Sequence, residues 1–183
     1  MNEYFEFEVI LKNIKPKIWR RFLLPKSATF SHLHDAIQNA CGWTNSHLYS
    51  FTTAGGRFKE EIASSSYTDN AFDRESPPSN KVKLASYFEM YEKCIYVYDF
   101  GDHWEHEIKL KKVVQDPSKF KRRLLAGKRA FPLEDCGSIP GYSECVDFVI
   151  GGKKNNPDLE DWISENWHPE AFDLEEMKKN FDN

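Results

Sequence analysis

The chain has 183 residues, of which 40% are hydrophobic, 15% aromatic and 30% charged, with a formal net charge of −4 at pH 7. This composition excludes an intrinsically disordered chain, and no apolar run approaches the roughly 20 residues of a membrane-spanning helix. The length predicts a single domain over residues 1–183, built around one hydrophobic core.

The four cysteines form no Cys-x-x-Cys pair and show no dense disulfide spacing. Because the N-terminus also lacks a signal-peptide pattern, we expect a reduced, cytoplasmic protein that does not associate with membranes. The negative net charge disfavours nucleic acid as the partner, since phosphate contacts need clustered cations.

The first half of the chain predicts an α+β fold. Residues 4–12 alternate apolar and polar side chains, as in a half-buried strand, and residues 17–24 predict a second strand. A helix over residues 29–41 follows, with Thr29 as its N-cap and Gly42 after its last turn.

Residues 48–53 predict a third strand, so the order of hairpin, helix and strand indicates a β-grasp-like start of a mixed or antiparallel sheet. Residues 55–80 are rich in Ser, Asp, Gly and Pro and predict a long surface excursion. Residues 142–183 predict a helical C-terminal part, whose last helix begins at Asp173.

A central β-hairpin over residues 94–114 carries the polar residues of most interest. A two-residue turn at Gly101-Asp102 would place Asp99 opposite Trp104 and bring Asp99 near His106 on one apolar face. Asp99 would then raise the pKa of His106. Two interpretations stay open at this point: a functional carboxylate–imidazole site and a buried structural pair.

The segment FPLEDCGSIPGY at residues 131–142 predicts a shaped loop that presents Glu134 and Asp135. If this loop folds over the hairpin end, its charge would serve a ligand-binding, hydrolytic or divalent-metal site. His103 and His106 are three residues apart on a strand and point to opposite faces. No metal site and no cofactor are therefore predicted from them.

A basic segment at residues 119–130 offers a second hypothesis. Together with the second strand it could engage phosphates of a nucleic acid, and the alternative is a solvated face that balances the acidic C-terminal part. The candidate phosphate contacts are Arg20, Arg21, Lys121, Arg122 and Arg123.

Five segments of the chain resemble the plasmid Ri ORF-3-like family in their order: IKPKIWRR, LHDAIQNACGWTNSHLYSF, YVYDFGDHWEHEI, LAGKRAFPLEDCGSIPGY and HPEAFDLEEM. The resemblance implies an α+β domain found on plasmids and beside insertion elements, with no reaction attached to it. The polar positions that match are His47, Asp99, Asp102, His106, Glu134 and Asp135. Phe131 stands where many relatives have a cysteine, so the Cys-x4-Cys pair of a thiolate metal site is missing.

Three function classes follow from these observations. The first is a binding domain for a small molecule or a peptide, with a carboxylate–histidine pocket at the turn end of the hairpin. The second is a nucleic-acid-binding accessory protein of mobile elements. The third is a hydrolase that uses His106 with the nearby acids, so whether the protein is an enzyme stays open.

Overall fold

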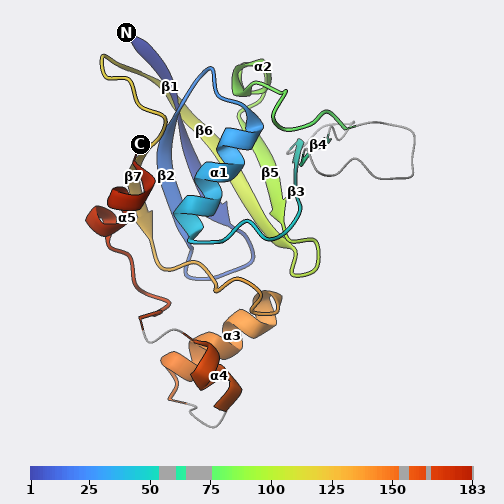
Figure 1. The fold of residues 1–183 in the computed structure, drawn as a ribbon, viewed down its shortest axis with the longest axis vertical. Coiled ribbons are helices and arrows are strands. Elements are labelled where there is room, and N and C mark those ends of the chain that lie inside the picture. Colours follow the sequence, from blue (N-terminus) through green and yellow to red (C-terminus); the bar gives the residue numbers. More distant parts are fainter. Residues whose placement is uncertain (54–60, 65–75, 153–156, 164–165, 183) are drawn as a thin grey trace.

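A computed structural model describes residues 1–53, 61–64, 76–152, 157–163 and 166–182 of the chain. Within these residues, seven strands form one sheet in the order β4-β3-β5-β6-β1-β2-β7, and every strand pair is antiparallel (Figure 1). The α+β class is thereby confirmed, with an antiparallel sheet.

The strands are β1 (Asn2–Leu11), β2 (Trp19–Pro25), β3 (Tyr49–Thr53), β4 (Glu61–Ala63), β5 (Lys93–Tyr98), β6 (Trp104–Asp116) and β7 (Arg123–Lys128). The helices are α1 (Phe30–Cys41), α2 (Leu84–Phe88), α3 (Ser138–Val149), α4 (Pro157–Trp162) and α5 (Leu174–Phe181). None of these helices is long and apolar enough to cross a membrane.

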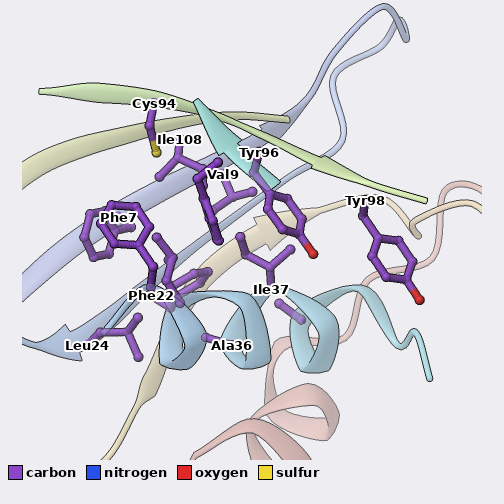
Figure 2. Close-up of a cluster of buried hydrophobic side chains, with 14 of the residues drawn as sticks. Phe7, Val9, Phe22, Leu24, Ala36, Ile37, Cys94, Tyr96, Tyr98 and Ile108 are labelled. Atoms are coloured by element: carbon purple, nitrogen blue, oxygen red, sulfur yellow. The ribbon is translucent and has the colours of Figure 1, made fainter. Parts of the chain in front are cut away.

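Helix α1 lies across one face of the sheet and covers the hydrophobic core (Figures 1 and 2). The alternation predicted for the first strand is confirmed, because Phe5, Phe7, Val9 and Leu11 are all buried. Gly42 ends the helix in the left-handed conformation, with φ of 77°, as a C-terminal glycine does. The predicted order of hairpin, helix and strand is therefore present.

The opposite face of the sheet carries paired charges. Glu6 of β1 lies 3.7 Å from Arg21 of β2 and 3.5 Å from Lys112 of β6, and Lys12 contacts Glu105. A sheet with one packed face and one polar face is the usual arrangement for antiparallel strands.

The predicted excursion at residues 55–80 falls largely outside the described residues. Its described part contains β4, which pairs with β3 at one edge of the sheet. The helical C-terminal part is present, although α3 begins at Ser138, four residues before the predicted start. Asp173 caps α5 as predicted, since its carboxylate accepts a hydrogen bond from the amide of Glu176 at 3.0 Å.

Candidate functional site

The β5–β6 connection is a five-residue loop, Asp99 to His103, so the predicted two-residue turn is wrong. Tyr98 pairs with Trp104, and Tyr96 pairs with His106. Asp99 and His103 both adopt left-handed backbone conformations, with φ of 54° and 56°. The Asp99 carboxylate accepts a hydrogen bond from the amide of Gly101 at 2.9 Å, which stabilises this wider turn.

The longer loop changes which side chains of β5 face the core. Tyr96 and Tyr98 point inward, in place of Asp99, which the predicted turn put on the core face (Figure 2). The Tyr96 hydroxyl finds polar partners on α1, where His34 Nδ1 lies 2.8 Å away and Gln38 donates a hydrogen bond at 3.0 Å. Two tyrosines can face the core because α1 and the acidic loop satisfy their hydroxyl groups.

His106 is a core residue and does not pair with Asp99. Its side chain is 0% exposed and is surrounded by the rings of Trp43, Tyr96 and Phe131. Nδ1 lies 3.0 Å from the carbonyl oxygen of Trp104. Burial lowers the pKa of His106 to about 4 and outweighs the effect of that carbonyl. The predicted increase of its pKa is therefore wrong, because no carboxylate of the described residues influences the ring.

The acidic loop, which runs from Phe131 to α3 and carries Glu134 and Asp135, folds over the turn end of the hairpin, so the condition for a site there is met. The Trp43 indole N–H donates to the Pro132 carbonyl at 2.9 Å and anchors the start of the loop. At its end, the amide of Gly137 donates to the Asp102 carboxylate at 3.0 Å. Asp102 therefore holds the loop against the hairpin.

Glu134 fastens the middle of the loop to two other segments. One carboxylate oxygen accepts hydrogen bonds from the amide and the hydroxyl of Thr44, at 2.7 and 2.6 Å, and the other accepts one from Tyr98. Desolvation raises the pKa of Glu134, but these hydrogen bonds lower it more, so the net pKa lies below its usual value. Glu134 is therefore an ionised anchor.

The cluster at this end of the sheet consists of His47, Asp99 and Asp135, and we call it the His47 cluster. Nε2 of His47 lies 2.6 Å from Oδ1 of Asp135 and 3.8 Å from Oδ2 of Asp99. The Asp99 side chain is 13% exposed and the Asp135 side chain is 62% exposed. One nitrogen and two carboxylate oxygens thus meet at the protein surface.

The charges around His47 favour its protonated form. Partial desolvation lowers the pKa of His47, but the hydrogen bond to Asp135 and the charges of Asp99, Asp135 and Glu134 raise it more. The net pKa of His47 therefore lies above its usual value. The cluster is a place where a positive charge is stabilised, whether that charge is a proton or another cation.

The sequence model of the plasmid pRiA4b ORF-3-like protein family matches residues 3–176, which include the whole His47 cluster. This chain belongs to that family.

Two relatives extend the family assignment. The uncharacterized protein y4hQ of Sinorhizobium fredii (strain NBRC 101917 / NGR234) is 29% identical over 179 residues, 96% of this chain and 89% of the relative. The crystal structure of MM3350, a protein of unknown function from Methanosarcina mazei Go1, has a TM-score of 0.82 and 30% identity. It covers 96% of both chains and confirms the fold. Because neither name carries an activity, the function of this ORF-3-like protein has to be argued from its site.

The six polar residues expected to form the site thus divide into three groups. His47, Asp99 and Asp135 meet in the His47 cluster, while Glu134 and Asp102 hold the surrounding loops. His106 lies in the core. No metal-ligand set was predicted from the sequence, yet the ligand atoms of the His47 cluster all lie within 4.8 Å of one another.

The sequence did not reveal the roles of Thr44 and Tyr98, which donate hydrogen bonds to Glu134. The signal available was the polar run TNSH after α1, which places four hydrogen-bonding side chains just before β3. Two exposed apolar side chains beside the cluster were also missed. Phe100 is 44% exposed, and Leu48 is 37% exposed and accepts a hydrogen bond from the Asp99 amide through its carbonyl.

The arginines considered for phosphate binding have partners within the protein. The Arg20 guanidinium is buried between the rings of Phe131 and Phe172, and Arg21 is 3.7 Å from Glu6. Arg122 donates to the Phe181 carbonyl and Arg123 to the Asp116 carboxylate. Lys121 alone of the five candidates is left without such a partner in the described part of the chain.

Proposed function

We propose that this ORF-3-like protein is a ligand-binding domain and that its ligand is a divalent transition-metal ion held by His47, Asp99 and Asp135. The observation that carries the proposal is the approach of three ligand atoms within 4.8 Å, from segments far apart in the sequence. An imidazole with two carboxylates suits zinc and its transition-metal neighbours. Magnesium and calcium prefer oxygen ligands alone.

The distances in the cluster support this choice of ligand. A tetrahedral zinc ion about 2.1 Å from each ligand atom requires those atoms to be about 3.4 Å apart. The His47–Asp135 separation of 2.6 Å and the His47–Asp99 separation of 3.8 Å lie on either side of that value. The Asp99–Asp135 separation lies within 4.8 Å, so small shifts of the three side chains would be needed to complete the coordination.

Hydrogen bonds behind the cluster orient the proposed ligands. Oδ1 of Asp99 is engaged by the Gly101 amide, which leaves Oδ2 directed at His47. The His47 amide donates to the Tyr98 hydroxyl at 3.3 Å, and Glu134 binds the same hydroxyl. Outer contacts of this kind commonly fix the ligands of metal sites.

Three protein ligands leave coordination positions for water or for a further molecule. A small molecule or a peptide, the ligand classes predicted from the sequence, could therefore complete the coordination. The hydrolase alternative would use the same open position for a water molecule, without His106. A cytoplasmic location also belongs to the proposal and is supported by the four free cysteines.

The second candidate function is binding of a basic peptide in the absence of metal. The exposed Phe100 and Leu48 favour it, because a lysine or arginine between Asp99 and Asp135 would bring its apolar neighbours onto them. Charge-assisted hydrogen bonds from a guanidinium to two carboxylates give strong recognition. The nucleic-acid alternative has less support, since Arg20, Arg21, Arg122 and Arg123 are occupied within the fold.

Calorimetric titration of metal-depleted protein with ZnCl₂, MnCl₂ and MgCl₂ tests the proposal. We expect one tight site for Zn²⁺ or Mn²⁺ and much weaker binding of Mg²⁺. His47→Gln and Asp135→Asn should each weaken metal binding at least tenfold, while His103→Gln should not, because His103 is exposed on the same hairpin outside the cluster. Failure of every metal to bind at a single site would reject the proposal.

A control variant and a peptide titration complete the test. Burial raises the pKa of the Cys136 thiol to about 12, so the thiol stays protonated and Cys136→Ser should leave metal binding unchanged. Titration with N-acetyl-Phe-Arg-amide tests the peptide candidate. Binding to metal-depleted protein that Asp135→Asn abolishes would favour the peptide over the metal.

A further inference from the structure

A second site lies at the far end of the sheet. A cavity of about 850 Å³ is formed by the start of β1, the end of β2, α2 and residues 119–121 of the β6–β7 connection. In Figure 1 this connection runs beside the N-terminus, whereas the β5–β6 turn is at the opposite end of the sheet. The length of β1 therefore separates the cavity from the His47 cluster. Cavities that hold small molecules have volumes of roughly 300–1,000 Å³.

One wall of the cavity is built and fixed by aromatic stacking. The rings of Tyr4 and Phe120 are parallel, with centroids 4.0 Å apart. The Tyr4 hydroxyl donates to the Ser118 carbonyl at 2.9 Å and accepts from the Phe120 amide at 3.1 Å. The Phe120 ring also contacts Arg123, whose guanidinium carbon lies 3.8 Å from the ring centroid. The wall is therefore preformed, which reduces the entropic cost of binding.

The opposite wall combines apolar surface with one paired lysine. Pro25 and Ala85 line it with apolar atoms. Lys26 also lines it, with its ammonium 3.0 Å from Glu89 and 3.9 Å from Glu3. The charge of Lys26 is thus largely balanced, and this wall offers mainly apolar contact.

Two other lysines give the cavity its charge. Lys119 and Lys121 flank Phe120 in the sequence and both line the cavity. Both are exposed, and neither has a carboxylate partner in the described part of the chain. The cavity therefore joins an apolar interior to two ammonium groups with no assigned counter-ion.

We propose that this cavity binds a small organic carboxylate with an apolar body, its carboxylate between Lys119 and Lys121 and its apolar body against Pro25 and Ala85. An inorganic anion would gain nothing from the apolar walls, and a neutral molecule would gain nothing from the lysines. A stacked nucleobase is disfavoured, because Tyr4 and Arg123 already occupy the ring of Phe120.

Titration of the full chain with sodium octanoate, followed by calorimetry and by amide chemical shifts, tests this site. We expect one octanoate per chain, with shifts confined to residues around the cavity. Inorganic phosphate has the negative charge without the alkyl chain, and 1-octanol has the alkyl chain without the charge. Each should bind at least tenfold more weakly than octanoate.

Variants identify the groups responsible. The double variant Lys119→Glu/Lys121→Glu should weaken octanoate binding at least about tenfold, as expected when two favourable charge contacts become repulsive. Lys15→Glu/Lys17→Glu changes the net charge equally near the other end of β1 and should bind as the wild type does. Ala85→Trp should block the cavity. Absence of octanoate binding, or equal binding by the two lysine variants, would overturn the proposal, and His47→Gln should have no effect.

Discussion

Nε2 of His47 lies 2.6 Å from Oδ1 of Asp135, although the two residues are 88 positions apart in the chain. The contact joins the segment before β3 to the acidic loop after β7, directly beside the β5–β6 turn. The carboxylates raise the pKa of His47 above its usual value and so favour its protonated form. Protein stability and metal affinity should therefore both depend on the protonation of His47.

The first prediction concerns the protonation of His47. Asp135→Asn removes the hydrogen-bonded charge and should lower the pKa of His47 toward its usual value of about 6.5. In the wild type, the raised pKa means that the stabilisation is present below about pH 6.5 and is lost as the pH rises through the folded value. Histidine ring NMR signals followed against pH measure both states.

Metal binding should show the opposite pH dependence. A metal ligand must be the neutral imidazole, so binding releases the proton that Asp135 and Asp99 favour. We expect Zn²⁺ affinity to increase between pH 6 and pH 8, with a proton released at the lower pH. An affinity independent of pH over this range would mean that His47 is not a ligand.

A second prediction separates Glu134 from its neighbour. Glu134→Gln weakens an acceptor that binds three donors and should destabilise the protein by roughly 1–3 kcal/mol. Asp135→Asn removes a largely exposed pair and should cost no more than about 1 kcal/mol. Urea unfolding of the two variants measures the difference. Equal losses would show that the acidic loop is not held through Glu134.

The hairpin shows how far the sequence could predict the fold. The sequence predicts that Trp104 and His106 lie on the apolar face, and both are buried. The predicted register of β5 is wrong, because Gly101 is compatible with a five-residue loop as well as with a two-residue turn. That loop depends on Asp99 adopting φ of 54° and binding the Gly101 amide, a choice that local sequence does not determine.

The site residues were predictable in type but not in pairing. Long-range contacts such as Glu134 with Thr44, or His47 with Asp135, depend on where the acidic loop crosses the hairpin. A one-residue error in the register of β5 moved Asp99 to the face of His106 in the prediction. Burial of an imidazole among aromatic rings needs the packing of α1 and the Phe131 segment, which no single motif contains.

The third prediction concerns the two buried histidines. Burial lowers the pKa of His34 and of His106 to about 4, so the unfolded chain binds more protons than the folded protein between about pH 6.5 and pH 4. Stability should therefore fall as the pH decreases through this range. Each histidine should contribute a loss of about 2 kcal/mol by pH 5. Urea unfolding at pH 7 and pH 5 measures this loss.

His106→Phe removes one of these groups and keeps a ring among Trp43, Tyr96 and Phe131. The variant should lose the contribution of His106 to the pH dependence and be more resistant to acid than the wild type. His103→Gln, which alters an exposed histidine of the same hairpin, should leave the pH dependence unchanged. If His106→Phe kept the full pH dependence, the pKa of His106 would not be lowered in the folded protein.

The last prediction concerns the space around Arg20. Its guanidinium carbon lies 4.9 Å from the ring centroid of Phe131 and 4.6 Å from that of Phe172, and no carboxylate pairs with it among the residues described. Gly127 of β7 makes this sandwich fit. A Cβ atom at Gly127 would lie 2.6 Å from the Phe172 ring and 2.8 Å from Cδ of Arg20.

Gly127→Ala should therefore destabilise the protein by roughly 1–3 kcal/mol, since the Phe172 ring must move off the guanidinium. Phe172→Ala removes the ring with which the new methyl group collides. In that background the added cost of Gly127→Ala should decrease but not vanish, because Cδ of Arg20 still lies 2.8 Å from the added Cβ. The double variant should therefore be destabilised by less than the sum of the two single losses. Urea unfolding of all four proteins measures the coupling. Additive losses would show that the methyl group and the Phe172 ring do not compete for this space.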